Sequence, residues 1–175
     1  MRLTFIPKSD SLHLSPNRIV KDGLLLSGLM TGLILIVARV NPDILSRGEV
    51  DEKTKKQRAL FFIPSLSFLF GIPLLSTILL RKQNNGKLSF ANAFLNAYSI
   101  GVLVNLFDLL VLDYLLVLIW KPGFIKSLAK EADPMYSSYL FHFKAFLRGM
   151  VITLVPSLVA AVFGRNYKRQ VQRID

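Results

Sequence analysis

The sequence predicts an all-α integral membrane protein, a polytopic bundle of four transmembrane helices in one domain spanning residues 1–175. Its composition is the first reason, because 52% of the 175 residues are hydrophobic and only 19% are charged. Such a balance is too apolar for an ordinary soluble domain. The second reason is that the charged residues gather between long apolar runs rather than within them.

Four apolar runs are candidates for crossing the bilayer. The first measures about 26 Å at 1.5 Å per residue, which is near the lower limit for a span. Lys21 and Arg39 flank it and can extend it by reaching toward the headgroups. The third is the longest, and it must tilt or project beyond the hydrocarbon. The expected spans are residues 24–40, 60–80, 94–120 and 141–164.

Two of these runs contain proline. Pro64 and Pro73 lie in the second run and predict a kink or local unwinding where backbone hydrogen bonds are lost. The apolar core of the fourth run, 150–163, is short and contains Pro156. The aromatic stretch 136–147 before it is either an interfacial helix or the beginning of a long fourth span.

The remaining segments are polar. They are an N-terminal segment (1–22), a charged connector (41–59) that we expect to be partly helical, an aromatic and polar connector (121–140) and a basic tail (165–175). Asn85 and Gly86 predict a tight turn in the short loop after the second run. The first run lacks a small-x-small cleavage pattern, so we expect it to stay in the mature protein.

Lysine and arginine divide equally between the two sides that four crossings create, with eleven on each. The positive-inside rule gives most weight to charges in short segments. The compact basic segments 81–87 and 165–169 therefore favour a plasma-membrane protein with both termini in the cytoplasm.

Three polar side chains interrupt the third run, namely Asn105, Asp108 and Asp113. An ionised carboxylate at the bilayer centre costs at least about 2.5–3.5 kcal/mol, so each acid should face protein, water or a cation. Asn105 and Asp108 share a face of an α-helix, whereas Asp108 and Asp113 are about 140° apart. We therefore expect separate partners for the two acids.

For Asp113, four residues are within reach as charge partners: Arg39, His142, Lys144 and Arg148. Because charges inside a membrane usually pair, Arg39 and Arg148 are the favoured partners.

Asp108 lies nearer the bilayer centre and is the better functional candidate. It would serve as a proton carrier, as a cation ligand or as the polar end of a small cavity. The structural alternative is a hydrogen bond to a serine of the second run, with Ser65, Ser67 and Ser76 as candidates.

Gly28 and Gly32 form a GxxxG pattern in the first run, which permits close helix approach. Packing inside the bundle is the favoured interpretation, and dimerisation is the alternative.

Several classes of function lack support. The chain has no cysteine and only two histidines, and it contains no HExxH, Walker A or GxSxG motif. We therefore expect no metal, no cofactor and no catalysis, although Asp108, Asp113 and His142 at one site would suit a membrane enzyme. The net charge of +11 suits anionic lipid headgroups better than nucleic acid, because the basic residues flank apolar runs.

Four segments resemble a family of small hypothetical bacterial integral membrane proteins with four helices. They are 38–42, 89–94, 105–114 and 139–149, and the resemblance as a whole covers most of the chain. The resemblance implies a bacterial plasma membrane and four spans, and it implies no activity or site residue.

Two functions stay open at this point. The favoured one is a membrane protein that acts through the lipid bilayer, a protein partner or a second copy of itself. The alternative is a small transporter-like protein, coupled to protons or cations, that uses Asp108 in a polar cavity beside the second span.

Overall fold

The computed structural model describes residues 14–45, 50–123 and 137–164, which form helices and, within these ranges, no strand. Four helical stretches are long and apolar enough to cross a membrane. This confirms the predicted all-α architecture of four spans. The stretches are Pro16–Val40, Glu52–Gln83, Phe90–Trp120 and Tyr139–Gly164.

Helix α1 (Pro16–Val40) starts earlier than the apolar run that predicted it. Pro16 occupies the first helical turn, where its missing N–H costs nothing and its fixed φ suits a helix. The polar residues 16–22 are therefore helical, about two turns that the expected span 24–40 did not include. Residues 1–13 lie outside the described ranges.

Helix α2 (Glu52–Gln83) follows the short 3₁₀ helix η1 (Pro42–Ile44) and takes up much of the charged connector. The carboxylate of Asp51 caps it by accepting a hydrogen bond from the backbone N–H of Thr54 at 3.0 Å. The helix then runs unbroken through Pro64 and Pro73, so the expected local unwinding does not occur. Within this helix the Thr77 hydroxyl donates to the carbonyl of Pro73 at 2.8 Å.

The third span consists of two helices in series. Helix α3 (Phe90–Phe107) begins where the Ser89 side chain accepts from the Asn92 N–H, and it continues directly as the π-helix η2 (Asp108–Trp120). The loop before α3 contains the predicted turn, since Asn85 and Gly86 both have positive φ, at 51° and 77°.

The fourth span is also built from two pieces, α5 (Tyr139–Ile152) and α6 (Leu154–Gly164). The aromatic stretch is thus the beginning of a long span, the second of the two alternatives. The break at Thr153 has a local cause, because the ring of Pro156 conflicts with the carbonyl of Ile152. The chain nevertheless stays nearly helical there, with the Ser157 N–H donating to the Thr153 carbonyl at 3.2 Å.

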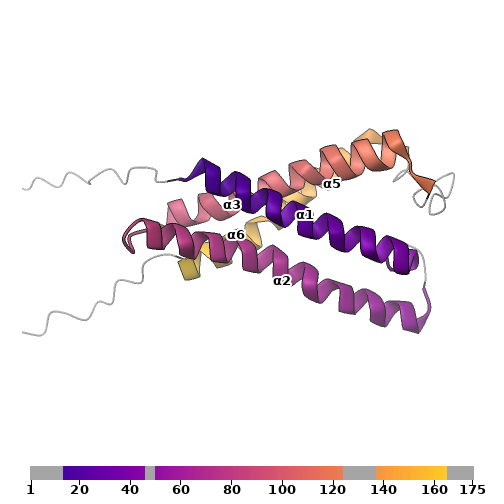
Figure 1. Cartoon of the computed structure of the whole chain (residues 1–175), viewed down its shortest axis with the longest axis horizontal. Helices are drawn as coiled ribbons and strands as arrows, with labels where there is room; N and C mark the ends of the chain where they lie inside the picture. Colours follow the sequence, from indigo (N-terminus) through magenta and orange to yellow (C-terminus); the bar gives the residue numbers. More distant parts are fainter. Residues whose placement is uncertain (1–13, 46–49, 124–136, 165–175) are drawn as a thin grey trace, which may run out of the picture.

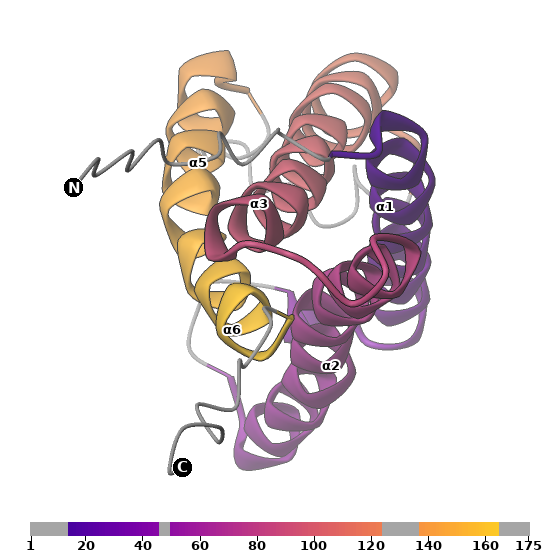
Figure 2. The same ribbon diagram turned by 90° about the vertical axis from the view of Figure 1, so that its left-hand side faces the viewer.

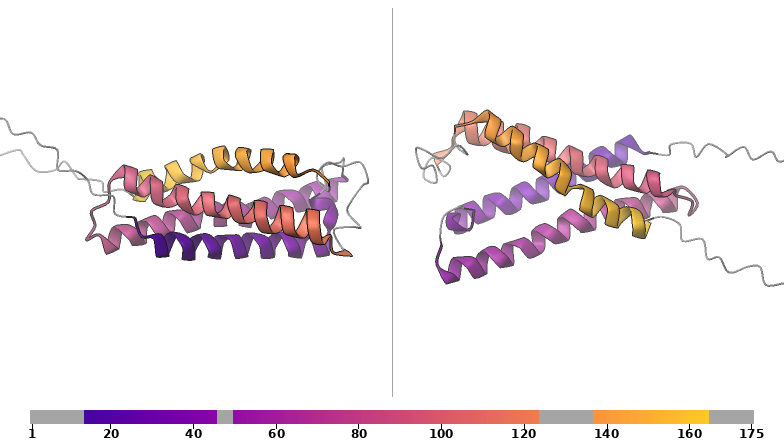
Figure 3. Two further views of the ribbon diagram at one scale, coloured as in Figure 1. Left: turned by 90° about the horizontal axis from the view of Figure 1, so that it is seen from above. Right: turned by 180° about the vertical axis from the view of Figure 1, so that it is seen from behind.

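The spans run up and down, with the loop after α2 at the same end as the start of α1 (Figure 1). Viewed along the bundle, α3 stands between α1 and α5, and α6 stands beside α2 (Figure 2). Small residues let α3 and α6 pack closely, because Ala93, Ala97, Ala160 and Ala161 are completely buried. Towards the other end, α1 and α2 diverge from η2 and α5 (Figure 3).

The outer surface is strongly apolar. Large side chains such as Leu25, Ile36, Leu110 and Val155 are at least half exposed, between 50% and 63%. A soluble monomer rarely presents so much contiguous apolar surface, whereas lipid tails would cover it.

Candidate functional site

A cavity of about 200 Å³ lies inside the bundle near the middle of the third span. All four spans contribute to it, and it is partly open. Its polar lining comes from Ser27 and Thr31 on α1, Asn105 on α3, Asp108 at the start of η2 and Thr153 between α5 and α6. The rest of its wall is apolar or glycine: Met30, Ile34, Leu69, Gly101, Val104, Phe107, Leu112, Gly149 and Ile152.

Asp108 is the charged group of this cavity. Within the described residues its carboxylate has no hydrogen bond and no ion pair, and the residue is exposed. The three serines considered as structural partners are engaged elsewhere. Ser65 and Ser67 donate to carbonyls of their own helix, and Ser76 accepts from Asn96.

Oxygen atoms dominate the polar lining. The Thr31 hydroxyl is buried and has no hydrogen-bond partner in the part of the chain that the structure describes. Asn105 donates its amide N–H groups to the Gly101 carbonyl and to the Thr153 hydroxyl at 2.8 Å each, and both of these residues also line the cavity. The cavity therefore combines one carboxylate with hydroxyl and amide groups in an otherwise apolar wall, an arrangement that suits a proton, water or a hard cation.

Asp113 does not line this cavity. Its carboxylate lies 2.9 Å from Nδ1 of His142 on α5, and the His142 side chain is only 3% exposed. Of the four candidate partners, the structure therefore places His142 next to Asp113. Because α5 packs along η2, this contact joins the third and fourth spans.

The other three candidates are exposed, namely Arg39, Lys144 and Arg148. In the described ranges none of them forms an ion pair. The preference for Arg39 or Arg148 as the partner of Asp113 is therefore not what the structure shows. Long cationic side chains near the ends of spans reach headgroups and water more easily than they reach a buried acid.

The π-helix changes the relation between the two acids. In a π-helix each N–H bonds the carbonyl five residues back, so residues five apart are neighbours, as Asp108 and Asp113 are. The expected separation assumed α-helical geometry and is wrong for this segment. Asp108 is close enough to Asp113 and His142 to interact with both electrostatically.

The glycines that permit close packing are not those of the GxxxG pattern. A Cβ at Gly28 or Gly32 would meet nothing within 4 Å, so the expected packing role inside the bundle is wrong for this pair. By contrast, a Cβ at Gly149 would collide with Oδ1 of Asn105, and one at Gly101 would collide with Thr153. Gly101 and Gly149 therefore allow close contact between the helices that form the polar wall of the cavity. Neither glycine belongs to a sequence motif, so the sequence did not predict this role.

Arg18 is the polar residue that the sequence analysis missed. Its guanidinium reaches from α1 to the Ser76 carbonyl of α2 at 3.4 Å, and its Nε is buried without a hydrogen-bond partner in the described residues. A sequence signal for its position did exist, because Pro16 is a typical first residue of a helix and Arg18 lies two residues after it. We instead assigned the residue to a polar segment.

No cluster of three histidine, cysteine or acidic side chains able to hold a metal occurs in the described part of the chain. Asp113 and His142 form a carboxylate–imidazole pair, and Asp108 is near enough to interact with both, but of the three only Asp108 is among the residues that line the cavity.

Comparisons with protein-family models, with curated proteins and with solved structures find nothing that matches this chain.

Proposed function

We propose that this chain is a small multi-pass protein of the plasma membrane that conducts or exchanges a proton or small cation through the Asp108 cavity. The observation that carries the proposal is a carboxylate that has no partner among the described residues and lines a partly polar cavity within the span. A carboxylate at this depth is expensive unless it is protonated, hydrated or bound to a cation. The cavity supplies room for water or an ion beside it.

The proposed orientation places both termini and the loop 84–89 in the cytoplasm. Short basic segments decide orientation most strongly, and this end of the bundle carries Arg81, Lys82 and Lys87 within one compact stretch. The cavity then lies near the middle of the third span, between the two ends of the bundle.

The test is flux in proteoliposomes that contain a trapped pH-sensitive dye. The wild-type protein is expected to dissipate an imposed pH gradient faster than empty liposomes, and parallel sodium and potassium gradients identify the ion. Asp108→Asn preserves the shape but removes the ionisable group, so its flux should fall to the rate of empty liposomes. Asp43→Asn makes the same chemical change at an exposed site of η1 and should behave as wild type.

Equal flux in Asp108→Asn and wild type would remove the proposal, as would wild-type flux no greater than that of empty liposomes. Either result would favour the other interpretation, a membrane protein whose acids serve packing and whose action depends on partners.

A further inference from the structure

Arg18 and Asn96 leave an unmatched donor and an unmatched acceptor at the basic end of the bundle. The Nε of Arg18 and the Oδ1 of Asn96 are both buried, and neither has a hydrogen-bond partner in the described residues. Asn96 itself is 0% exposed. Unmatched buried polar atoms are rare in proteins, and an unpaired charged donor is the most costly kind.

The two residues bond to the same residue of α2 from different helices. Arg18 donates to the Ser76 carbonyl at 3.4 Å, and Asn96 donates to the Ser76 hydroxyl at 3.3 Å. Asn96 also donates to the Thr77 hydroxyl at 3.2 Å, which commits its amide nitrogen and leaves the oxygen. The donor and the acceptor therefore flank Ser76 between α1, α2 and α3.

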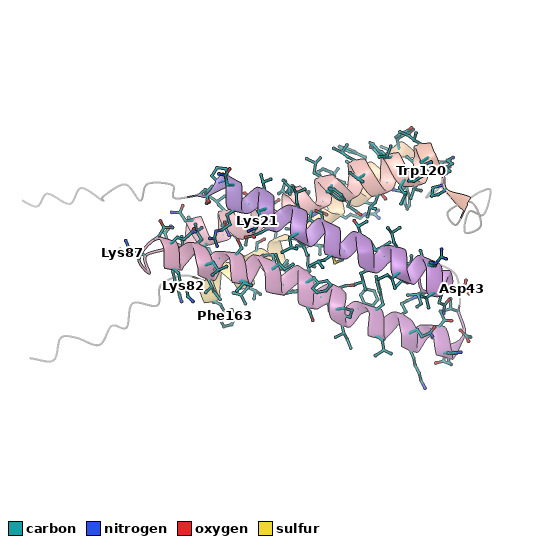
Figure 4. The ribbon with its side chains drawn as sticks, viewed as in Figure 1. Lys21, Asp43, Lys82, Lys87, Trp120 and Phe163 are labelled. Atoms are coloured by element: carbon teal, nitrogen blue, oxygen red, sulfur yellow. The ribbon has the colours of Figure 1, made fainter. Side chains whose placement is uncertain are left out.

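The charge of Arg18 is also uncompensated. Asp22 lies one turn further along α1, yet Arg18 forms no ion pair in the described ranges. Lys21, Lys82 and Lys87 lie towards the same end of the bundle, which Figure 4 shows on the side opposite Asp43 and Trp120. An anion at this end would gain from the whole group of cations.

Depth restricts the kind of anion. Ser76 is about 6 Å, or roughly one helical turn, inside Leu80, where the apolar part of α2 ends. Phosphate groups of lipids lie near this boundary, and they accept hydrogen bonds from arginine. Asn96 additionally requires a donor, which a headgroup hydroxyl or a protonated phosphate supplies.

We propose that Arg18, Ser76 and Asn96 form a binding site for a phosphate group that also bears a hydroxyl, such as the glycerol headgroup of an anionic lipid. Arg18 donates to the phosphate oxygens, and the hydroxyl donates to Asn96. This site is separate from the Asp108 cavity and does not depend on the proposed flux.

Thermal unfolding of the detergent-purified full chain, followed by circular dichroism, tests the site. The probes are dihexanoyl phosphatidylglycerol, dihexanoyl phosphatidylcholine and inorganic phosphate at matched ionic strength. We expect a saturable rise in Tm with phosphatidylglycerol and none with phosphatidylcholine, which is zwitterionic and lacks the hydroxyl. An equal rise with inorganic phosphate would identify a free phosphate as the ligand instead of a lipid.

Arg18→Gln should raise the half-saturating concentration roughly tenfold or more, because a charge-assisted hydrogen bond is lost. Arg39→Gln makes the same chemical change at an exposed position at the other end of α1 and should keep the response. Arg18→Lys keeps the charge but lacks Nε, so phosphatidylglycerol should raise its Tm only weakly. This variant replaces Arg18→Gln in the test if the glutamine variant does not fold. An undiminished response in Arg18→Gln or Arg18→Lys, or no response in wild type, would overturn the proposal.

Discussion

Asp113 and His142 show how a single side-chain contact can tie two spans together. The pair joins η2 to α5 at 2.9 Å, and its imidazole is almost completely buried. Removing one member of such a pair leaves a poorly solvated polar group, which costs more than the bond itself contributes.

We therefore expect His142→Phe, which keeps a ring, and Asp113→Asn each to lower the free energy of unfolding by about 2 kcal/mol. The double variant should lose less than the two single losses together, with a coupling of about 1–2 kcal/mol. Unfolding by denaturing detergent, followed by circular dichroism, measures the cycle.

Arg148→Gln provides the matched control, because Arg148 is exposed on the same helix as His142 and was one of the two partners that the sequence favoured. Its change should stay within about 0.5 kcal/mol. Strict additivity of His142→Phe and Asp113→Asn, or strong coupling of Asp113 to Arg148, would contradict the pairing that the structure shows.

The contacts of individual residues were harder to predict from the sequence than the helices or the overall fold. Composition alone identified Asn105, Asp108 and Asp113 as polar groups within a span, and two of them do line the cavity. Their partners depend on which helix faces which and on the rotation of each helix, and neither is encoded in a local pattern. Arg18 was missed because apolar character, and not helix formation, was used to place the start of the first span.

Helix α2 illustrates capping at the level of whole elements. Asp51 accepts a hydrogen bond from Thr54, and this bond, followed by the neighbouring Lys53 charge, holds the pKa of Asp51 below its ordinary value of 3.8. A lowered pKa means that the ionised cap stabilises the helix start at neutral pH. The contribution begins to fade as the pH falls below about 4 and is gone once the pH passes below the folded-state pKa.

Asp51→Ala should accordingly speed hydrogen exchange of the first-turn amides of α2 at neutral pH, whereas Asp51→Asn should keep the exchange slow, because asparagine also caps helices. Nuclear magnetic resonance of the Asp51 carboxyl carbon measures its titration directly. A midpoint at or above the ordinary value of 3.8 would refute the cap-based account.

Spacing between helices is set by glycines that contact polar side chains. Gly149→Ala forces its methyl group against Asn105, whose amide is already committed to Gly101 and Thr153. We expect a loss of about 1–3 kcal/mol in unfolding free energy, as in other overpacked sites.

Gly28→Ala is the control for this prediction, since a Cβ there meets nothing within 4 Å. Alanine favours a helix over glycine by about 1 kcal/mol, so this variant should be neutral or slightly more stable. Equal destabilisation by both substitutions would show that Gly28 of the GxxxG pattern contributes to helix packing as much as Gly149 does, against the structure.

At this level the sequence was a better guide. Apolar runs located all four spans, and the Asn85–Gly86 turn has the backbone that its composition predicts. The π-helix was not foreseeable, because Asp108–Trp120 contains no proline or glycine to mark a change of helix type. That change decides whether Asp108 and Asp113 are neighbours, so an error about helix type became an error about the site.

For the whole molecule, the number of crossings determines which segments lie at the same end of the bundle. The start of α1 and the loop after α2 lie at one end, whereas η1 lies at the other (Figure 1). This relation follows from the number of spans, which is why it could be predicted when side-chain partners could not. The choice between the two sides of the membrane depends on the distribution of basic charge.

The natural chain contains no cysteine, so single cysteines report orientation without background. In intact cells, a membrane-impermeant maleimide should label Asp43→Cys at the η1 end and leave Asn85→Cys unlabelled until the membrane is permeabilised. This pattern follows if the compact basic segment 81–87 stays in the cytoplasm. Labelling of Asn85→Cys alone would invert the proposed orientation but keep the four-span fold, whereas labelling of both positions in sealed cells would contradict the fold itself.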